Sequence, residues 1–134
     1  SGFTTALLAS LAQRVVSLEI DGNVASAART RLQQAGITNA EVHQADATAN
    51  GFAACAAEGP WNAILVSGSV AEVPAELLAL LAPGGRLITI VGHEPVMRAT
   101  LVTRVDETHC STAQPWDTVA PRLRNFAEPS RFSF

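Results

Sequence analysis

Three short segments of this sequence carry the small and acidic residues that a nucleoside-binding site needs. Ser1 and Gly2 precede an apolar helical stretch, and a glycine there lets a ligand approach backbone N–H groups closely. Glu19 ends a β-branched run at about the 20-residue offset where open α/β sheets place a carboxylate. A carboxylate has two oxygens, so it can accept hydrogen bonds from both hydroxyls of a ribose.

Asp46 and Ile20 extend this pattern toward a base. Asp46 ends the third strand, where its carboxylate can accept a hydrogen bond from the exocyclic amine of an adenine while Ile20 packs on the ring. A plainer interpretation stays open, because an acidic residue at a strand end is more often a helix cap or a solvated turn. The order and spacing of the three segments favour nucleotide binding.

The first 46 residues predict the elements that would position these groups. Leu7, Leu8 and Leu11 share one face of a short helix over residues 4–12, and VVSLEI then reads as a buried strand. Residues 23–36 form an amphipathic helix, with Asp21 as its cap and Gly36 as its left-handed end. Its predicted apolar face comprises Val24, Ala27, Ala28, Leu32 and Ala35, together with Arg31. Residues 40–45 are a short strand that leads to Asp46.

The same alternation continues to residue 92. A loose alanine-rich helix near residues 50–57 precedes an apolar strand over residues 61–67, which runs into Gly68 and Ser69. Pro74 opens a leucine-rich helix that ends at the Pro83-Gly84-Gly85 turn, before a strand over residues 86–92. Strands alternating with helices predict an α/β fold, a Rossmann-like three-layer sandwich with a mostly parallel sheet.

The tail follows a different pattern. Residues 97–105 and 109–119 alternate in polarity with no helix between them, which predicts an antiparallel hairpin at the edge of the sheet. The last fifteen residues read as an extended segment. With no linker or repeat, residues 1–134 are expected to form a single domain.

Composition argues against several classes of partner. The net charge of −3 and pI of about 5.5 do not favour nucleic-acid binding, and no apolar run reaches the ~20 residues of a spanning helix. We therefore expect no membrane partner and a cytoplasmic location. Cys55 and Cys110 lack ligands at metal-binding spacing, so no metal site is expected. The three histidines fit surface or hydrogen-bonded positions better than a nucleophile motif.

Several blocks together resemble one enzyme family. SGFTTALLASLAQRVVSLEID, VHQADAT, WNAILVSGSVAEVPAELLALLAPGGRLITIVG and the closing PSRFSF are similar to protein-L-isoaspartate O-methyltransferases along nearly the whole chain. The stretch AEVPAELLALLAPGGRL is the most specific to that family. Class I S-adenosylmethionine-dependent methyltransferases in general share the first block and the Asp46 block.

The resemblance implies a seven-stranded sheet of order 3-2-1-4-5-7-6 that binds S-adenosyl-L-methionine. It implies methyl transfer to the carboxylate of an isoaspartyl residue in a damaged peptide or protein, which is a repair reaction. The implied cofactor contacts are Ser1 and Gly2 at the methionine part, Glu19 at the ribose, Ile20, Asp46 and Ala47 at the adenine, and Ser67 and Gly68 near the sulfonium. Residues 69–73 would face the peptide, and no residue is assigned a proton-transfer role.

The same comparison leads us to expect an N-terminally truncated domain. The family's first strand and the earlier part of its glycine turn have no counterpart here, and the chain has no initiator methionine. Weak cofactor binding and homo-oligomerisation through exposed sheet edges are therefore expected. Two alternatives stay open: a methyltransferase acting on a small molecule, and a fragment with no activity by itself.

Overall fold

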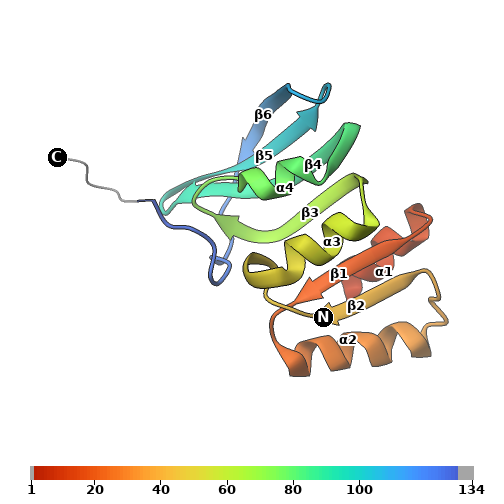
Figure 1. The fold of residues 1–134 in the computed structure, drawn as a ribbon. Coiled ribbons are helices and arrows are strands. Elements are labelled where there is room, and N and C mark those ends of the chain that lie inside the picture. Colours follow the sequence, from red (N-terminus) through yellow and green to blue (C-terminus); the bar gives the residue numbers. More distant parts are fainter. Residues whose placement is uncertain (1, 130–134) are drawn as a thin grey trace. The chain divides into compact units, whose positions relative to one another are not determined.

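The computed structural model describes residues 2–129, so Ser1 and residues 130–134 of the closing block lie outside the described residues. Two compact units divide the chain after Cys55, and each is described by itself. The first unit contains α1 (Phe3–Leu11), β1 (Val15–Glu19), α2 (Gly22–Gln34), β2 (Ala40–Gln44) and the π-helical turn η1 (Ala47–Gly51) (Figure 1). The second contains β3 (Trp61–Val70), α4 (Ala75–Ala79), β4 (Leu81–His93), β5 (Val96–Arg104) and β6 (Cys110–Asp117), while α3 (Phe52–Glu58) spans the division.

In the first unit, β1 and β2 form a parallel pair from Val15 opposite Ala40 to Glu19 opposite Gln44. Side chains alternate between the two faces of a strand, so Val42 and Gln44 share the face that α2 covers. The core of this unit comprises Ala25, Ala28, Leu32 and Val42, with Ala6 of α1 packed against it. Helices α1 and α2 thus contribute to the same side of the strand pair.

The predicted ends of α2 are confirmed. Asp21 Oδ1 accepts hydrogen bonds from the N–H groups of Asn23 and Val24, at 2.8 and 3.1 Å. Gly36 follows the helix with φ 71°, the left-handed conformation expected of a glycine terminator. The sequence therefore located both ends of this helix from the local chemistry of its caps.

The predicted apolar faces of α1 and α2 are only partly right. Ala25 is fully buried whereas Val24 is 37% exposed, which rotates the buried face of α2 by one residue. The small side chains of Ala25 and Ala28 let α2 lie close to its neighbours, and that close approach selects the buried face. In α1, Leu7 and Leu11 are exposed, at 51% and 87%, and the buried residue is Thr5.

The helix expected near residues 50–57 starts earlier, with a π-helical turn. The Asp46 carbonyl accepts hydrogen bonds from the N–H groups of Ala49, Asn50 and Gly51, at 3.2, 3.3 and 3.1 Å. The last of these is an i to i+5 bond, which widens the turn before α3 begins at Phe52. Single π-helical turns of this kind are often found at functional sites.

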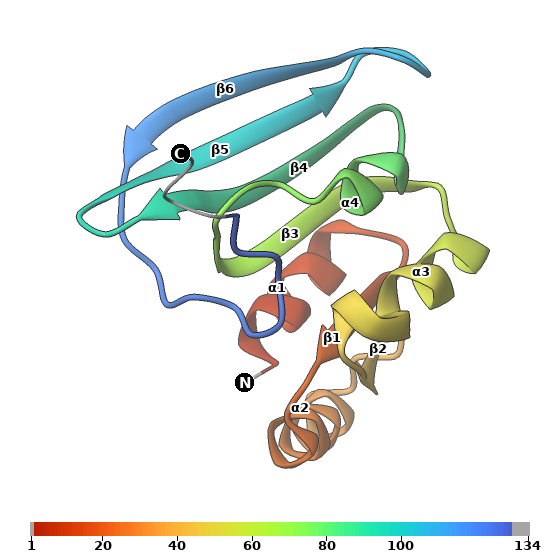
Figure 2. The same ribbon diagram turned by 60° about the vertical axis from the view of Figure 1, so that its left-hand side comes forward.

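The second unit is a mixed sheet of order β3-β4-β5-β6 (Figure 2). The β3–β4 pair is parallel, and the β4–β5 and β5–β6 pairs are antiparallel, so the predicted C-terminal hairpin is confirmed. The order 3-2-1-4-5-7-6 implied by the family resemblance counts a strand before β1, so its strands 4–7 correspond to β3–β6. That order would place β6, the last strand, next to β4, and it is wrong for this sheet. Instead, a tight turn joins His93 to Val96 and makes β5 the direct neighbour of β4.

Two boundaries in this unit also differ from the prediction. Strand β3 continues to Val70, since a register shift after Leu65 lets Ser69 and Val70 pair with Ile90 and Val91. Helix α4 ends at Ala79, because Trp61 N–H donates to the Leu80 carbonyl at 2.8 Å and draws the chain into β4 at Leu81. The core of the unit includes Val70, Leu77, Leu81, Leu87, Met97 and Val102.

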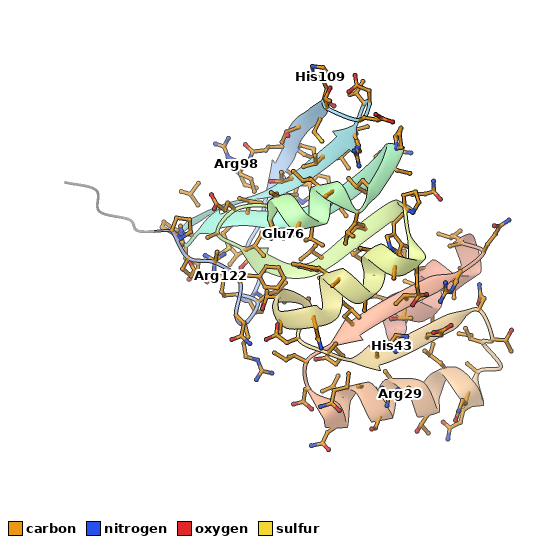
Figure 3. The ribbon with its side chains drawn as sticks, in the orientation of Figure 1. Arg29, His43, Glu76, Arg98, His109 and Arg122 are labelled. Atoms are coloured by element: carbon orange, nitrogen blue, oxygen red, sulfur yellow. The ribbon has the colours of Figure 1, made fainter. Side chains whose placement is uncertain are left out.

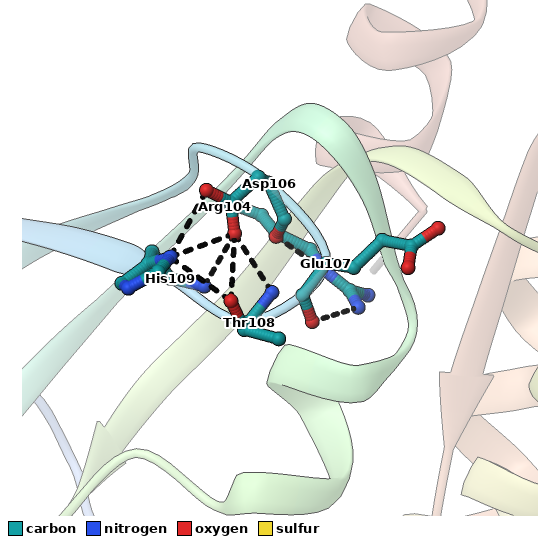
Figure 4. A network of polar contacts seen from close by, with 5 residues as sticks. All are labelled: Arg104, Asp106, Glu107, Thr108 and His109. Atoms are coloured by element: carbon teal, nitrogen blue, oxygen red, sulfur yellow. Dashed lines mark hydrogen bonds and ion pairs between the residues drawn. The ribbon is translucent and has the colours of Figure 1, made fainter.

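The β5–β6 turn is closed by the carboxylate of Asp106 (Figure 4). This carboxylate accepts from the Thr108 N–H at 2.8 Å, the His109 N–H at 2.9 Å and the Thr108 hydroxyl at 3.1 Å, and it contacts His109 Nδ1 at 2.9 Å. Beneath the turn, Arg104 donates to the carbonyls of Leu81 and Glu107, at 2.6 and 2.9 Å. Hydrogen bonds between polar groups therefore hold this turn in its conformation.

The turn is expected to loosen only in strong acid. The Thr108 N–H, followed by the His109 side chain, lowers the pKa of Asp106 from its ordinary 3.8. A lowered folded-state pKa means that the contribution to stability is present above pH 3.8 and is lost as the pH falls through the lowered value. NMR titration of the Asp106 carboxyl carbon should give a midpoint below 3.8, and in Asp106→Asn the acid-induced shift of the Thr108 amide should disappear. A midpoint at or above 3.8 would contradict this prediction.

No helix in residues 2–129 is long and apolar enough to cross a membrane.

Candidate functional site

Glu19 lies at the carboxyl end of β1, opposite Gln44 of β2. Its Oε1 atom accepts a hydrogen bond from the Asp21 N–H at 3.0 Å, and its carbonyl accepts from the Ala45 N–H at 3.0 Å. The side chain is half-buried. One carboxylate oxygen is therefore oriented by the backbone, while Oε2 keeps its capacity to accept hydrogen bonds from a ligand.

Asp46 lies just beyond the end of β2 and caps η1. Its Oδ1 atom accepts from the Thr48 N–H at 2.9 Å and from the Thr48 hydroxyl at 2.6 Å. The capping role that the sequence left open is thus present in the structure. Capping does not exclude ligand binding, because an ionised carboxylate offers about four lone-pair sites on its two oxygens.

Gly2 lies at the start of α1, on the same edge of the first unit. Asn39 ties together the opposite edge, because its side chain donates to the carbonyls of Ala9 and Ala12 and its own carbonyl accepts from the Val15 N–H. The end of α1 and the starts of β1 and β2 therefore meet at one edge. The start of α1 lies at the other, beside the ends of both strands (Figure 1).

The backbone at Gly2 fits a glycine alone. Its φ is 82°, and a Cβ added there would lie 3.2 Å from Cα and Cβ of Ala28. The first turn of α1 can thus rest directly on α2, with its backbone N–H groups at the edge that carries Glu19 and Asp46. A helix start next to two carboxylates suits a ligand with several hydrogen-bonding groups.

Ile20 and Ala47 follow the two strand ends and are half-buried, so each can contribute apolar surface. On the opposite face of β1, Leu18 packs against η1, because a Cβ added to Gly51 would lie 2.8 Å from Leu18 Cδ1. That contact holds η1, and with it Asp46, against β1. Ser1 lies outside the described residues.

Ser67 and Gly68 belong to the second unit, within β3 and not in a loop after it. Ser67 is exposed and Gly68 is buried. A Cβ added to Gly68 would meet Leu123 Cγ and Cδ2 at 2.6 Å, so the segment that follows β6 packs directly on this glycine. The structure therefore adds a layer over Gly68 that the sequence did not predict.

That segment is the part of the second unit that sequence reasoning missed. Arg122 forms an isolated parallel bridge with Ser69, and its guanidinium donates to the Gly92 carbonyl at 2.7 Å and contacts His93 Nδ1 at 2.9 Å. In Figure 3, Arg122 lies in the chain that follows β6. Only an extended tail was predicted there, and no periodic signal marks a contact made by a single bridge. The expectation that His93 is hydrogen-bonded is confirmed.

Within residues 2–129, no group of three or more His, Cys, Asp or Glu side chains is placed to hold a metal ion.

Fold and site together define the class of protein: a Rossmann-like α/β domain with small and acidic residues at the carboxyl ends of its parallel strands. Residues 1–118 match the sequence model of the protein-L-isoaspartate(D-aspartate) O-methyltransferase (PCMT) family. The chain belongs to this family.

Individual relatives agree with this assignment. A protein-L-isoaspartate O-methyltransferase of Pseudomonas paraeruginosa is 36% identical over 107 residues, which are 80% of this chain and 49% of that protein. One from Methanoculleus marisnigri is 42% identical over 92 residues, which are 69% of this chain and 40% of that protein. The chain thus spans about half the length of the curated relatives that it matches.

Solved structures show the same fold. A structure described as a protein-L-isoaspartate O-methyltransferase of Plasmodium falciparum, in complex with S-adenosyl-L-homocysteine, superposes with a TM-score of 0.72 at 19% identity. The match covers 83% of this chain and 52% of that one. At this level of identity the likeness concerns the fold alone.

Proposed function

We propose that this chain binds S-adenosyl-L-methionine and forms the cofactor-binding part of a protein-L-isoaspartate O-methyltransferase, which methylates isoaspartyl carboxylates in damaged proteins. The observation that carries the proposal is the meeting of Gly2, Glu19 and Asp46 at one edge of the first unit, in a chain of this family. That edge is where open parallel sheets bind nucleotides.

The groups at this edge suit an adenosyl ligand. Glu19 Oε2 is an acceptor for the ribose hydroxyls, and the second carboxylate, at Asp46, suits the adenine amine. Ile20 and Ala47 supply apolar contact for the ring, and Gly2 supplies backbone for the methionine part, where Ser1 stays a prediction from the sequence. Ser67 and Gly68 of the second unit stay predictions from the family resemblance, which implies contacts near the sulfonium.

For methyl transfer to a carboxylate, the main task of the protein is to position the two reactants. The cofactor, when bound, supplies a methyl group attached to a positively charged sulfur. An ionised carboxylate attacks without losing a proton, so alignment and exclusion of water supply most of the acceleration. This chemistry requires no general acid or base, in line with the absence of a predicted one.

For partners other than the substrate, and for the location in the cell, the proposal rests on predictions from the sequence. The acidic composition argues against nucleic acid, and a cytoplasmic location and association through sheet edges are expected on the grounds already given. A chromatographic measurement of mass in solution would test the predicted self-association.

The function is tested by calorimetry and by a methylation assay on this chain. S-adenosyl-L-homocysteine should bind, and labelled cofactor with an isoaspartyl peptide should give base-labile methyl esters, whereas the same peptide with an ordinary aspartate should not. Methylation confined to small acceptors such as quinones would support the small-molecule alternative instead. No detectable affinity for the cofactor would support the inert alternative.

A further inference from the structure

Two buried polar atoms in the second unit have no hydrogen-bond partner. In the described part of the chain these are Ser69 Oγ and Arg122 Nη1. Ser69 is fully buried, at 0% exposure. Burying an unpaired donor carries a desolvation penalty that is larger for a charged group, so buried donors of this kind call for an explanation.

The two residues lie side by side. Ser69 and Arg122 are the partners of an isolated parallel bridge, formed by the Ser69 N–H donating to the Pro121 carbonyl at 2.8 Å and the Leu123 N–H donating to the Ser69 carbonyl at 2.9 Å. Paired residues of neighbouring strands project their side chains to the same face. The orphaned hydroxyl and the orphaned guanidinium nitrogen therefore share one face of the sheet.

The remaining nitrogens of Arg122 are firmly held. Nε lies 2.9 Å from Glu128 Oε1, and Nη2 lies 2.7 Å from the Gly92 carbonyl and 2.9 Å from His93 Nδ1. A guanidinium is planar, so fixing two of its nitrogens also fixes the third. Nη1 is thus oriented in advance for an acceptor that residues 2–129 do not supply.

This pair lies at the carboxyl ends of two parallel strands. Ser69 is next to the last residue of β3, and Gly92 and His93 end β4. Ligands of open α/β sheets bind outside these ends. The orphaned donors therefore lie where a substrate, and not a structural partner, is expected.

We infer that Arg122 Nη1 and Ser69 Oγ bind one oxygen of the methyl-accepting carboxylate. This inference rests on the proposed function. Only one guanidinium nitrogen is available, so the pair holds a single oxygen and leaves the other to attack. That second oxygen forms the new bond to the methyl carbon while the methyl–sulfur bond breaks, its electron pair stays on sulfur, and no proton is transferred.

Access to Ser69 requires a small movement. Residues 121–123 cover it through one bridge with two backbone hydrogen bonds and through the contact of Leu123 with Gly68. The Arg122 side chain is 27% exposed, but Nη1 itself is buried, so the same movement must uncover this nitrogen for a carboxylate.

The test compares an isoaspartyl peptide with its analogue in which the free carboxylate is a carboxamide. Binding is measured by calorimetry at saturating S-adenosyl-L-homocysteine. The unchanged protein should prefer the carboxylate by roughly 10-fold or more, because a charge-assisted hydrogen bond is lost in the amide. Ser69→Ala and Arg122→Met should both lose this preference, whereas Arg124→Met, an exposed arginine of the same segment, should keep it.

Methylation kinetics separate substrate binding from a structural role. In Ser69→Ala, which removes a hydroxyl that has no partner among the described residues, the KM for peptide should rise about 10-fold with the cofactor affinity unchanged. Arg122→Lys should restore part of the loss seen in Arg122→Met, since it keeps the charge. If methylation proceeds but Ser69→Ala and Arg122→Met both keep the normal KM and carboxylate preference, the inference is overturned while the proposed function stands. Failure of the unchanged protein to bind cofactor would contradict the proposed function itself.

Discussion

Replacing Glu19 with alanine is expected to weaken S-adenosyl-L-homocysteine binding by about 100-fold. Each hydrogen bond to a charged group contributes about 1.5–3 kcal/mol, and the Glu19 carboxylate is proposed to accept two from the ribose. Glu19→Gln keeps an acceptor oxygen for the Asp21 N–H and should therefore lose less, about 10-fold. Isothermal titration calorimetry on the purified variants measures both changes.

Glu41 provides the matched control. It lies on β2, is exposed, and pairs only at the surface with Arg14 at 3.4 Å and His43 at 3.1 Å. Glu41→Gln makes the same change of charge in the same unit and should leave the cofactor affinity unchanged. Equal effects of Glu19→Gln and Glu41→Gln would mean that general electrostatics, and not a ribose contact, governs binding.

Gly92→Ala is expected to destabilise the protein by about 3 kcal/mol, which combines backbone strain with a steric clash. The φ of Gly92 is 124°, a conformation that alanine adopts only with strain, and its new Cβ would lie 2.6 Å from the Val96 carbonyl oxygen. Both backbones belong to the paired β4–β5 ladder, in which Gly92 lies opposite Met97 and His93 opposite Val96. Urea denaturation followed by circular dichroism should show the lower stability.

Gly84 separates the two contributions. Its φ is 80°, yet a Cβ added there would meet nothing within 4 Å. Gly84→Ala should thus show the strain alone, about 1 kcal/mol. If Gly92→Ala lowers stability no more than Gly84→Ala does, the clash with Val96 is relieved by movement and the predicted difference is wrong.

Features with a local cause were predictable from the sequence. The cap at Asp21, the left-handed Gly36 and the hairpin of β5 and β6 are each specified by a few neighbouring residues. The placement of Glu19 and Asp46 at the ends of adjacent strands also follows from local periodicity, because parallel neighbours end at the same edge.

Features that depend on close packing were not predictable. The buried face of α2 turns by one residue because Ala25 and Ala28 allow a closer approach than Val24 does. Strand β3 extends to Val70 because its last residues pair with Ile90 and Val91 of β4. Sequence periodicity measures polarity along one element, and it holds no information on how near the next element lies.

The amino-acid sequence by itself determined the α/β class and the family, because these follow from local patterns, and it predicts the residues of the first unit that would contact an adenosyl ligand. Only the tertiary structure decided that Asp46 also caps η1, that Leu123 covers Gly68, and that Ser69 lies beside Arg122. The last contact joins residues 53 positions apart through a single bridge. Such a pairing depends on the path of the whole intervening sheet, which no local signal encodes.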